Sequence, residues 1–206
     1  DTPLTASVKI SQNVLGSSLE SVVSLYAHSR RIDIHLGIEW KEYSKLLKFA
    51  LPLSIRSEKA VYEIPYGNIE RSTSRKTALD AARYEVPAQR WAVLEDRKGG
   101  VGLLNDGRYG YDAAPGKLRI SILKAPGFPD PECDRGYHRL KLAVYPYTGN
   151  WRDAQVNCSA ALFNDPPVQV FSEQKPARKL KKQLSMLLNP ATAILTPPGF
   201  TETRRM

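Results

Sequence analysis

Cysteine, histidine and long apolar runs are all scarce in this sequence. Only 2 of its 206 residues are Cys and only 3 are His. No apolar run is long enough to cross a bilayer, so we expect no membrane partner. Cys133 and Cys158 could form one disulfide, but neither lies in a CxxC motif. We favour two reduced thiols, which is typical of a cytoplasmic protein.

The three histidines lack the spacing that metal sites need. His28, His35 and His138 have neither an HxD partner nor the HExxH pattern. His35 falls on the polar face of a predicted strand and His28 lies near a strand end, so we expect both at the surface. We therefore predict no metal ligand and no catalytic residue in this chain.

Acidic residues are outnumbered, and the net charge is +9. Such a balance raises the hypothesis of a nucleic-acid binder, since cations neutralise phosphates. However, the charges are spread along the chain, and only residues 175–182 are densely basic. No zinc-finger, helix-turn-helix or RNA-binding signature accompanies them. We therefore interpret the charge as a solvated or partner-facing surface and expect no nucleic-acid partner.

Alternating apolar residues predict an antiparallel β-sandwich, an all-β fold. Side chains alternate across a strand, so apolar residues at every second position mark a half-buried strand. The 15 Pro and 13 Gly favour many turns over long helices. Segment 17–26 fits a helix or a strand equally well by its pattern. Strands are predicted at 5–10, 31–40, 46–55 (an edge or bulged strand, broken at Pro52), 60–64, 84–86, 91–94, 118–122 and 140–144.

The remaining segments are predicted to be loops or tails. Residues 69–82 are polar and are expected to loop outward, and residues 97–100 to form a turn. We place one sandwich domain at 1–170. Residues 171–206 form a basic, partly irregular tail: a linker or short amphipathic helix, then the start of a further β-region. The chain opens at Asp1 and stops at Met206, so we expect a fragment, a processed piece or one product of a split gene.

Several motifs occur in an order that carries a family resemblance. They are VYEIPYGNIERSTS, RYEVPAQRW, GVGLLNDGRYGYD, LRISILKAP, PDPECDRGYH and AVYPYTGNW. Together they resemble the C-terminal β-sandwich region of glycoside hydrolase family 38 α-mannosidases, in the cytosolic and microbial branch, over roughly residues 25–170. The resemblance implies a galactose-mutarotase-like sandwich and favours a strand over residues 17–26.

The resemblance also implies a function for the whole enzyme. Family 38 enzymes are retaining, zinc-dependent exo-α-mannosidases whose Asp nucleophile and zinc ligands lie in an N-terminal barrel, followed by a helical domain. None of those motifs occurs here. We expect this chain to be inactive alone, to shape the substrate cleft beside that barrel, and to have α-mannoside glycans, the barrel and the helical domain as partners. Zinc is expected only in the catalytic domain.

Seven residues are candidates for the cleft. Each carboxylate taken singly is more often a loop cap than a catalytic group. Asp134 and His138 resemble the family's Asp-x-Gly-x-His signature, although local backbone bonding explains them equally well. Lys124 stands where the family branch usually has Arg, and lysine loses the bidentate fork. The substrate-cleft candidates are Asn105, Asp106, Tyr109, Tyr111, Lys124, Asp134 and His138.

Aromatic residues leave an alternative function open. Tyrosines at 109, 111, 145 and 147 and Trp151 could stack on sugar rings, or could equally be core and rim residues. Trp40 and Trp91 are expected in the core. If the loop aromatics bind sugar by themselves, the chain is a stand-alone carbohydrate-binding module rather than part of an α-mannosidase.

Overall fold

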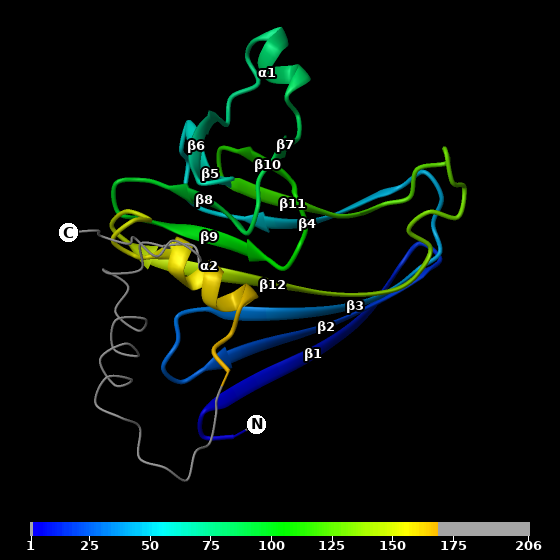
Figure 1. The fold of residues 1–206 in the computed structure, drawn as a ribbon, viewed down its shortest axis with the longest axis horizontal. Helices are drawn as coiled ribbons and strands as arrows, with labels where there is room; N and C mark the ends of the chain where they lie inside the picture. The colour runs from blue at the N-terminus through cyan, green and yellow to red at the C-terminus, as the bar shows by residue number, and fades with distance from the viewer. Residues whose placement is uncertain (1, 169–206) are drawn as a thin grey trace, which may run out of the picture. The chain divides into compact units, whose positions relative to one another are not determined.

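The computed structural model describes residues 2–168, and these form two antiparallel sheets and two helices (Figure 1). The tail predicted over 171–206 lies outside the described residues. Within the described part no helix is long and apolar enough to span a membrane.

The large sheet has eight strands in the order β1-β2-β3-β12-β9-β8-β5-β6. Every neighbouring pair is antiparallel, and β12 is the long central strand that joins the N-terminal strands to the rest. Its strands are β1 (Thr5–Val14), β2 (Ser17–Tyr26), β3 (Ile32–Trp40), β5 (Lys59–Ile64), β6 (Gly67–Ser72), β8 (Trp91–Glu95), β9 (Gly99–Asn105) and β12 (Gly136–Thr148).

The small sheet has four strands in the order β4-β11-β10-β7. These are β4 (Leu46–Pro52), β11 (Lys117–Lys124), β10 (Gly110–Ala114) and β7 (Val86–Pro87). β4 lies at the edge and ends at Pro52, where proline removes a ladder donor. The pairing of β4 with β11 contains a register shift between Ser121 and Leu123. The edge position predicted for 46–55 is confirmed, although the strand ends at Pro52 and the extra residue at the register shift belongs to β11.

The main core lies between the two sheets. The predicted alternation holds: Leu118 and Ile120 of β11 face Leu140 and Leu142 of β12, and all four are buried. Trp40 is also buried there, as expected. Burying this apolar area drives the two layers together. The antiparallel all-β sandwich is thereby confirmed, and segment 17–26 is a strand.

A second core covers the other face of the large sheet and was not predicted. Helix α2 (Val156–Asn164) lies against β8 and β9 (Figure 1), with Val156, Ala160 and Phe163 buried. Trp91 stacks on Trp151 with ring centroids 4.8 Å apart. Asp33 of β3 shares the face that alternation along 31–40 would leave in solvent, but this second layer leaves it only 5% exposed, and Arg31 Nε holds its carboxylate at 2.6 Å.

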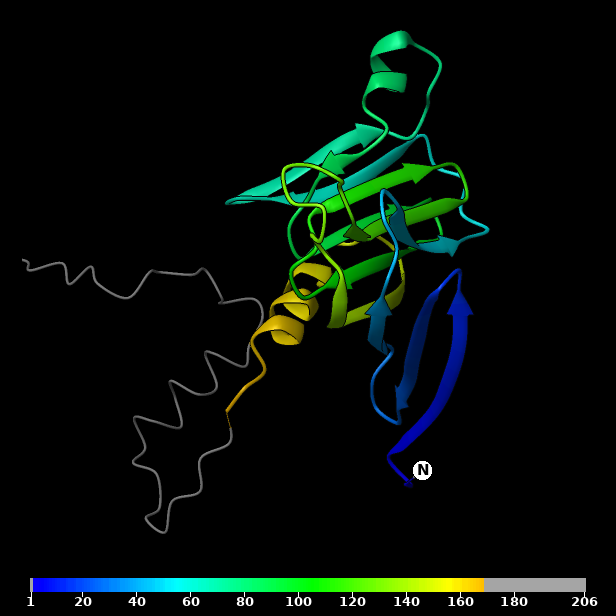
Figure 2. The ribbon, with the colours of Figure 1, turned by 90° about the vertical axis from the view of Figure 1, so that its right-hand side faces the viewer.

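The segment predicted to loop over 69–82 is only partly a loop. Residues 67–72 pair with β5 as strand β6, because the turn at 65–66 returns the chain antiparallel. Helix α1 (Ala78–Ala82) follows, capped by the Thr77 hydroxyl on the Asp80 amide, and it buries none of its residues. Residues 74–84 project beyond the two sheets as an arm (Figures 1 and 2). The turn predicted at 97–100 is shorter, because β9 begins at Gly99.

Candidate functional site

The connection from β9 to β10 is organised by a buried asparagine. Asn105 is 0% exposed, and its Oδ1 accepts from the amides of Gly107 (2.7 Å) and Arg108 (2.5 Å). Its Nδ2 donates to the Gln89 carbonyl (2.7 Å) and to the Tyr111 hydroxyl (2.5 Å). Burial raises the pKa of Tyr111 above its ordinary value, so this hydroxyl stays protonated. Asn105 and Tyr111 therefore fix the loop from inside the core.

Replacing Asn105 by alanine is expected to destabilise the chain by about 1–3 kcal/mol, because two backbone amides and a buried hydroxyl lose their partner. Urea unfolding of the variant measures this. Asn150→Ala is the control, since Asn150 caps an exposed turn. Equal, small losses for both variants would contradict the organising role of Asn105.

A second group of candidate residues gathers in the β11–β12 connection. The Asp134 carboxylate accepts from the Lys124 amide (3.1 Å), and His138 Nε2 lies 2.8 Å from the Asp134 carbonyl. Asp134 has a φ of 63°, a left-handed conformation that aspartate tolerates because it bonds locally. The Lys124 side chain is exposed and makes no ion pair with a described residue. Asp134 and His138 thus hold the loop and leave the Lys124 amine in solvent.

Two further candidates, Asp106 and Tyr109, bond to neither of these groups through their side chains. Asp106 Oδ2 accepts from the Lys141 amide (3.0 Å), which ties the first loop to β12. The Tyr109 side chain is 63% exposed. The structure therefore brings Lys124, Asp134 and His138 together, and joins Asn105 to Tyr111, but does not merge all seven candidates into one pocket.

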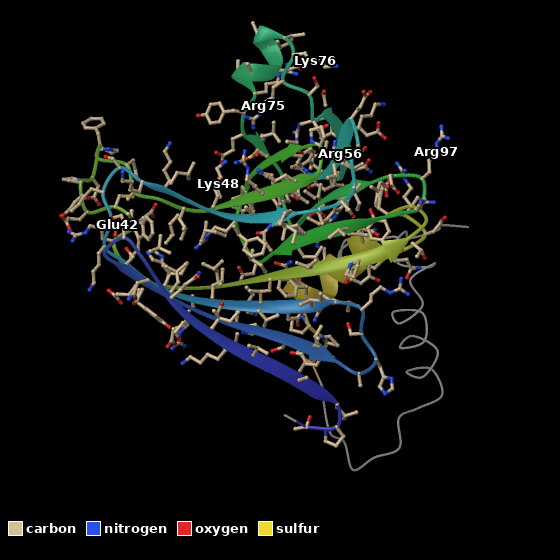
Figure 3. All side chains as sticks on the ribbon, turned by 180° about the vertical axis from the view of Figure 1, so that it is seen from behind. Glu42, Lys48, Arg56, Arg75, Lys76 and Arg97 are labelled. Carbon is tan, nitrogen blue, oxygen red and sulfur yellow. The ribbon has the colours of Figure 1, made fainter. Side chains whose placement is uncertain are left out.

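The end of the sandwich that carries the β11–β12 loop exposes both polar and apolar residues, and we call this end the rim. Glu42 Oε1 accepts from the Gly16 amide and the Ser17 hydroxyl, both at 2.8 Å, and so ties the β1–β2 turn to the β3–β4 connection. Tyr43 bonds to Glu132 of the long loop. Three large apolar side chains are exposed here: Leu15 (69%), Tyr43 (50%) and Phe128 (85%). In Figure 3, Glu42 marks this end and Arg97 marks the opposite end.

The remaining aromatic candidates belong to the second core. Tyr147 and Trp151 are buried against α2, and the Tyr145 hydroxyl donates to the Ala154 carbonyl at 3.2 Å. Their role in this structure is packing. Trp91 is buried with them, as expected of a core residue.

Asp112 is the centre of a charged cluster that the sequence did not predict. As one of several carboxylates beside Gly and Tyr it was expected to cap a loop, but it lies on strand β10 and is 3% exposed. Lys48 Nζ lies 2.7 Å and Arg119 Nη2 lies 2.6 Å from its carboxylate oxygens. Arg75 approaches at 3.6 Å. One buried carboxylate is thus surrounded by three cations on the outer face of the small sheet.

A cavity of about 520 Å³ opens beside this cluster, under the arm. We call it the arginine pocket, because Arg71, Arg75 and Arg83 all line it, together with Tyr62. Its size lies in the range of small-molecule sites. Burial and the neighbouring charge of Arg83 act against the protonated form of Arg71 and lower the pKa of Arg71. The guanidinium of Arg71 stacks over the Tyr62 ring at 5.0 Å.

Tyr62 makes the stability of the chain depend on alkaline pH. Burial, with a smaller contribution from Asp112, raises the pKa of Tyr62 from 10.0 to about 12. Because the unfolded chain loses this proton first, stability is unaffected below pH 10 and falls as the pH rises from 10 to about 12, by about 1.4 kcal/mol per pH unit. Urea unfolding of wild type and Tyr62→Phe across this interval measures the difference. Parallel curves for the two proteins would contradict it.

Residues 2–168 were searched for side chains that could together bind a metal ion. They contain no group of three or more His, Cys, Asp or Glu side chains that could hold an ion. His28 and His35 are exposed, as predicted. Cys133 and Cys158 are unpaired. The described residues therefore do not fit a zinc site, and zinc stays an expectation for the catalytic domain.

Two facing antiparallel sheets, a covering helix and structured end loops define this chain as an all-β sandwich domain with loop-borne polar and aromatic groups. Residues 1–132 match the model of the glycosyl hydrolases family 38 C-terminal domain. The chain belongs to this family.

Curated relatives agree with this assignment. Alpha-mannosidase G of Dictyostelium discoideum is 37% identical over 139 residues, which is 68% of this chain and 13% of that protein. Human Alpha-mannosidase 2C1 is 37% identical over 150 residues, 73% of this chain and 14% of that protein. An Alpha-mannosidase of Saccharomyces cerevisiae is 35% identical over 138 residues, 64% of this chain and 13% of that protein. The chain therefore spans only a small part of the relatives' length.

Solved structures show the same fold. A family 38 glycosyl hydrolase from Enterococcus faecalis superimposes with a TM-score of 0.67 at 16% identity, covering 78% of this chain and 20% of that one. An alpha-mannosidase from E. faecalis V583 gives a TM-score of 0.69 with the same identity and coverage. At this identity the likeness concerns the fold alone.

Proposed function

We propose that this chain is the β-sandwich part of an α-mannosidase that hydrolyses terminal α-mannosides with retention. The observation that carries the proposal is the match of residues 1–132 to the family 38 C-terminal domain, with α-mannosidases 35–37% identical. The nucleophile and the zinc ligands belong to a catalytic barrel outside this chain. The sandwich docks on that barrel and on a helical domain and shapes the cleft that receives α-mannoside glycans.

The rim end of the sandwich suits this docking role. Leu15, Tyr43 and Phe128 place exposed apolar surface at one end, and exposed apolar patches are typical of interfaces between domains. The hydrogen bonds of Glu42 and Asp134 hold the connecting loops in place, so the surface is ordered before docking. Lys124 and Tyr109 are the exposed candidates for contact with the sugar. Asn105, Asp106, Tyr111, Asp134 and His138 act as positioning residues.

The two thiols support a cytoplasmic location for the proposed enzyme. Cys133 and Cys158 remain unpaired, and free thiols persist in reducing compartments.

Kinetic measurements on the whole enzyme test whether the rim faces the substrate cleft. Lys124→Gln is expected to lower kcat/KM for an aryl α-mannoside about tenfold, because one charge near the cleft is lost. Arg97→Gln removes a charge at the opposite end (Figure 3) and is expected to leave kcat/KM unchanged. Equal effects of the two substitutions, or none, would contradict the cleft-facing orientation. Saturable binding of mannose oligosaccharides by this chain alone would instead favour a carbohydrate-binding module.

A further inference from the structure

The three guanidinium groups of the arginine pocket lack a close acidic partner. Arg83 makes no ion pair with any residue of the described chain, and its side chain is exposed. Arg71 Nη1 donates to the Pro87 carbonyl at 2.9 Å rather than to a carboxylate. Arg75 is 3.6 Å from Asp112, which already has two closer cations. Three positive charges therefore line one cavity with little local compensation.

The four carboxylates in the same lining are engaged elsewhere. Glu70 pairs with Lys59 at 3.2 Å. Glu85 accepts from Ser121 (2.6 Å) and from Lys48 (3.3 Å). The Asp80 carboxylate accepts from the Thr77 amide that begins α1. Glu70 and Glu85 thus have lysine partners, whereas Asp80 bonds to a neutral amide and keeps its charge. Among the described residues, Asp112 is the one carboxylate within ion-pair distance of any of the three arginines.

The hydroxyl of Tyr62, whose ring is buried, adds a second, independent feature. Tyr62 is 1% exposed, lines the cavity, and has no hydrogen-bond partner for its hydroxyl among the residues that the structure describes. The hydroxyl oxygen is not one of the buried side-chain atoms that lack a partner, so it is accessible from the cavity and free to bond to a ligand or water there. Its pKa of about 12 keeps the proton on the oxygen at neutral pH, so this group can donate. A hydrogen-bond donor and three guanidinium groups thus face one space.

We propose that the arginine pocket binds an oxyanion, a phosphate group carried by a hexose-sized ligand, through Arg71, Arg75, Arg83 and the Tyr62 hydroxyl. Guanidinium groups bind phosphate oxygens through paired, charge-assisted hydrogen bonds, and a phenol donor completes such a set. The cavity is larger than a phosphate needs and leaves room for the carrier. Arg83 and Arg75 lie on the arm and Tyr62 on β5, so the ligand also links the arm to the large sheet.

Calorimetric titration of the full 206-residue chain tests this site. The probes are glucose 6-phosphate, inorganic phosphate and glucose at matched ionic strength. Glucose 6-phosphate and phosphate are expected to bind saturably, and glucose is not. Arg83→Gln and Tyr62→Phe are each expected to weaken binding about tenfold, the effect of one lost charge-assisted hydrogen bond. Thermal melting verifies that both variants fold.

Arg56→Gln is the matched control, because Arg56 is exposed and does not line the pocket (Figure 3). It is expected to bind glucose 6-phosphate as wild type does. Absence of saturable binding, equal binding of glucose, or an equal loss in Arg56→Gln would overturn the site. The titration needs no catalytic domain, so a failure to bind phosphate would not argue against the proposed α-mannosidase role. Likewise, a failure of the α-mannosidase proposal would not argue against the pocket.

Discussion

Replacing Asp112 by alanine is expected to lower the free energy of unfolding of this chain by about 3 kcal/mol. The carboxylate is 3% exposed and lies within 2.7 Å of Lys48 and Arg119. Removing it leaves Arg119 and Arg75 without a counter-charge and leaves Lys48 with Glu85 alone, at 3.3 Å. The cations are partly exposed and recover some hydration, so we expect the lower end of the usual range of about 3–5 kcal/mol.

Urea unfolding measures the effect, and Glu20→Ala is the control. Glu20 pairs with Lys9 at 2.9 Å, but both side chains are more than half exposed, and such pairs contribute at most about 1 kcal/mol. If Asp112→Ala falls within that small range, the cluster is not a structural centre of the small sheet.

Replacing Trp91 by alanine is expected to cost about 3–5 kcal/mol, because it leaves a large cavity in the second core. Trp91 is 2% exposed and stacks on Trp151, which precedes α2. Trp91→Phe keeps an aromatic ring, and the buried Trp91 Nε1 has no hydrogen-bond partner in the described structure. The phenylalanine variant should therefore lose only about 1.5 kcal/mol or less.

Chemical denaturation compares the two tryptophan variants with wild type, and labelling of Cys158 reports on α2 directly. Cys158 lies on α2 and is half-buried, so loosening of the helix in Trp91→Ala should speed its labelling relative to Cys133. A loss as large in Trp91→Phe as in Trp91→Ala would show that ring packing is not what stabilises this layer.

The strands could be predicted where apolar and polar residues alternate along the sequence. Apolar residues recur at every second position in the predicted strands 31–40, 118–122 and 140–144, and a period of two over such lengths indicates a strand. The second layer nevertheless buries Asp33 and Ala143, on the face that alternation alone would leave in solvent. Helix α2 escaped prediction because it is only nine residues long, and its buried side chains pack on Trp91 and Tyr147 of distant strands. Tertiary packing of this kind is invisible to local patterns.

The site was predictable only as a set of loops. Asn105 and Asp134 are turn-forming residue types, and both indeed bond to nearby backbone amides. Which side chains stay exposed depends on strand pairing, so the burial of Tyr111 and the exposure of Tyr109 could not be read from the sequence. The Asp112 cluster and the arginine pocket join β4, β10, β11 and the arm, segments far apart in the chain.

Hydrolysis of an aryl α-mannoside tests the central claim most directly. The chain alone and the chain joined to a family 38 catalytic barrel are assayed with and without zinc. The account predicts no turnover by the chain alone under either condition, and zinc-dependent turnover by the joined protein. Turnover by the 206-residue chain itself would contradict a supporting role, because it would place a nucleophile within the sandwich.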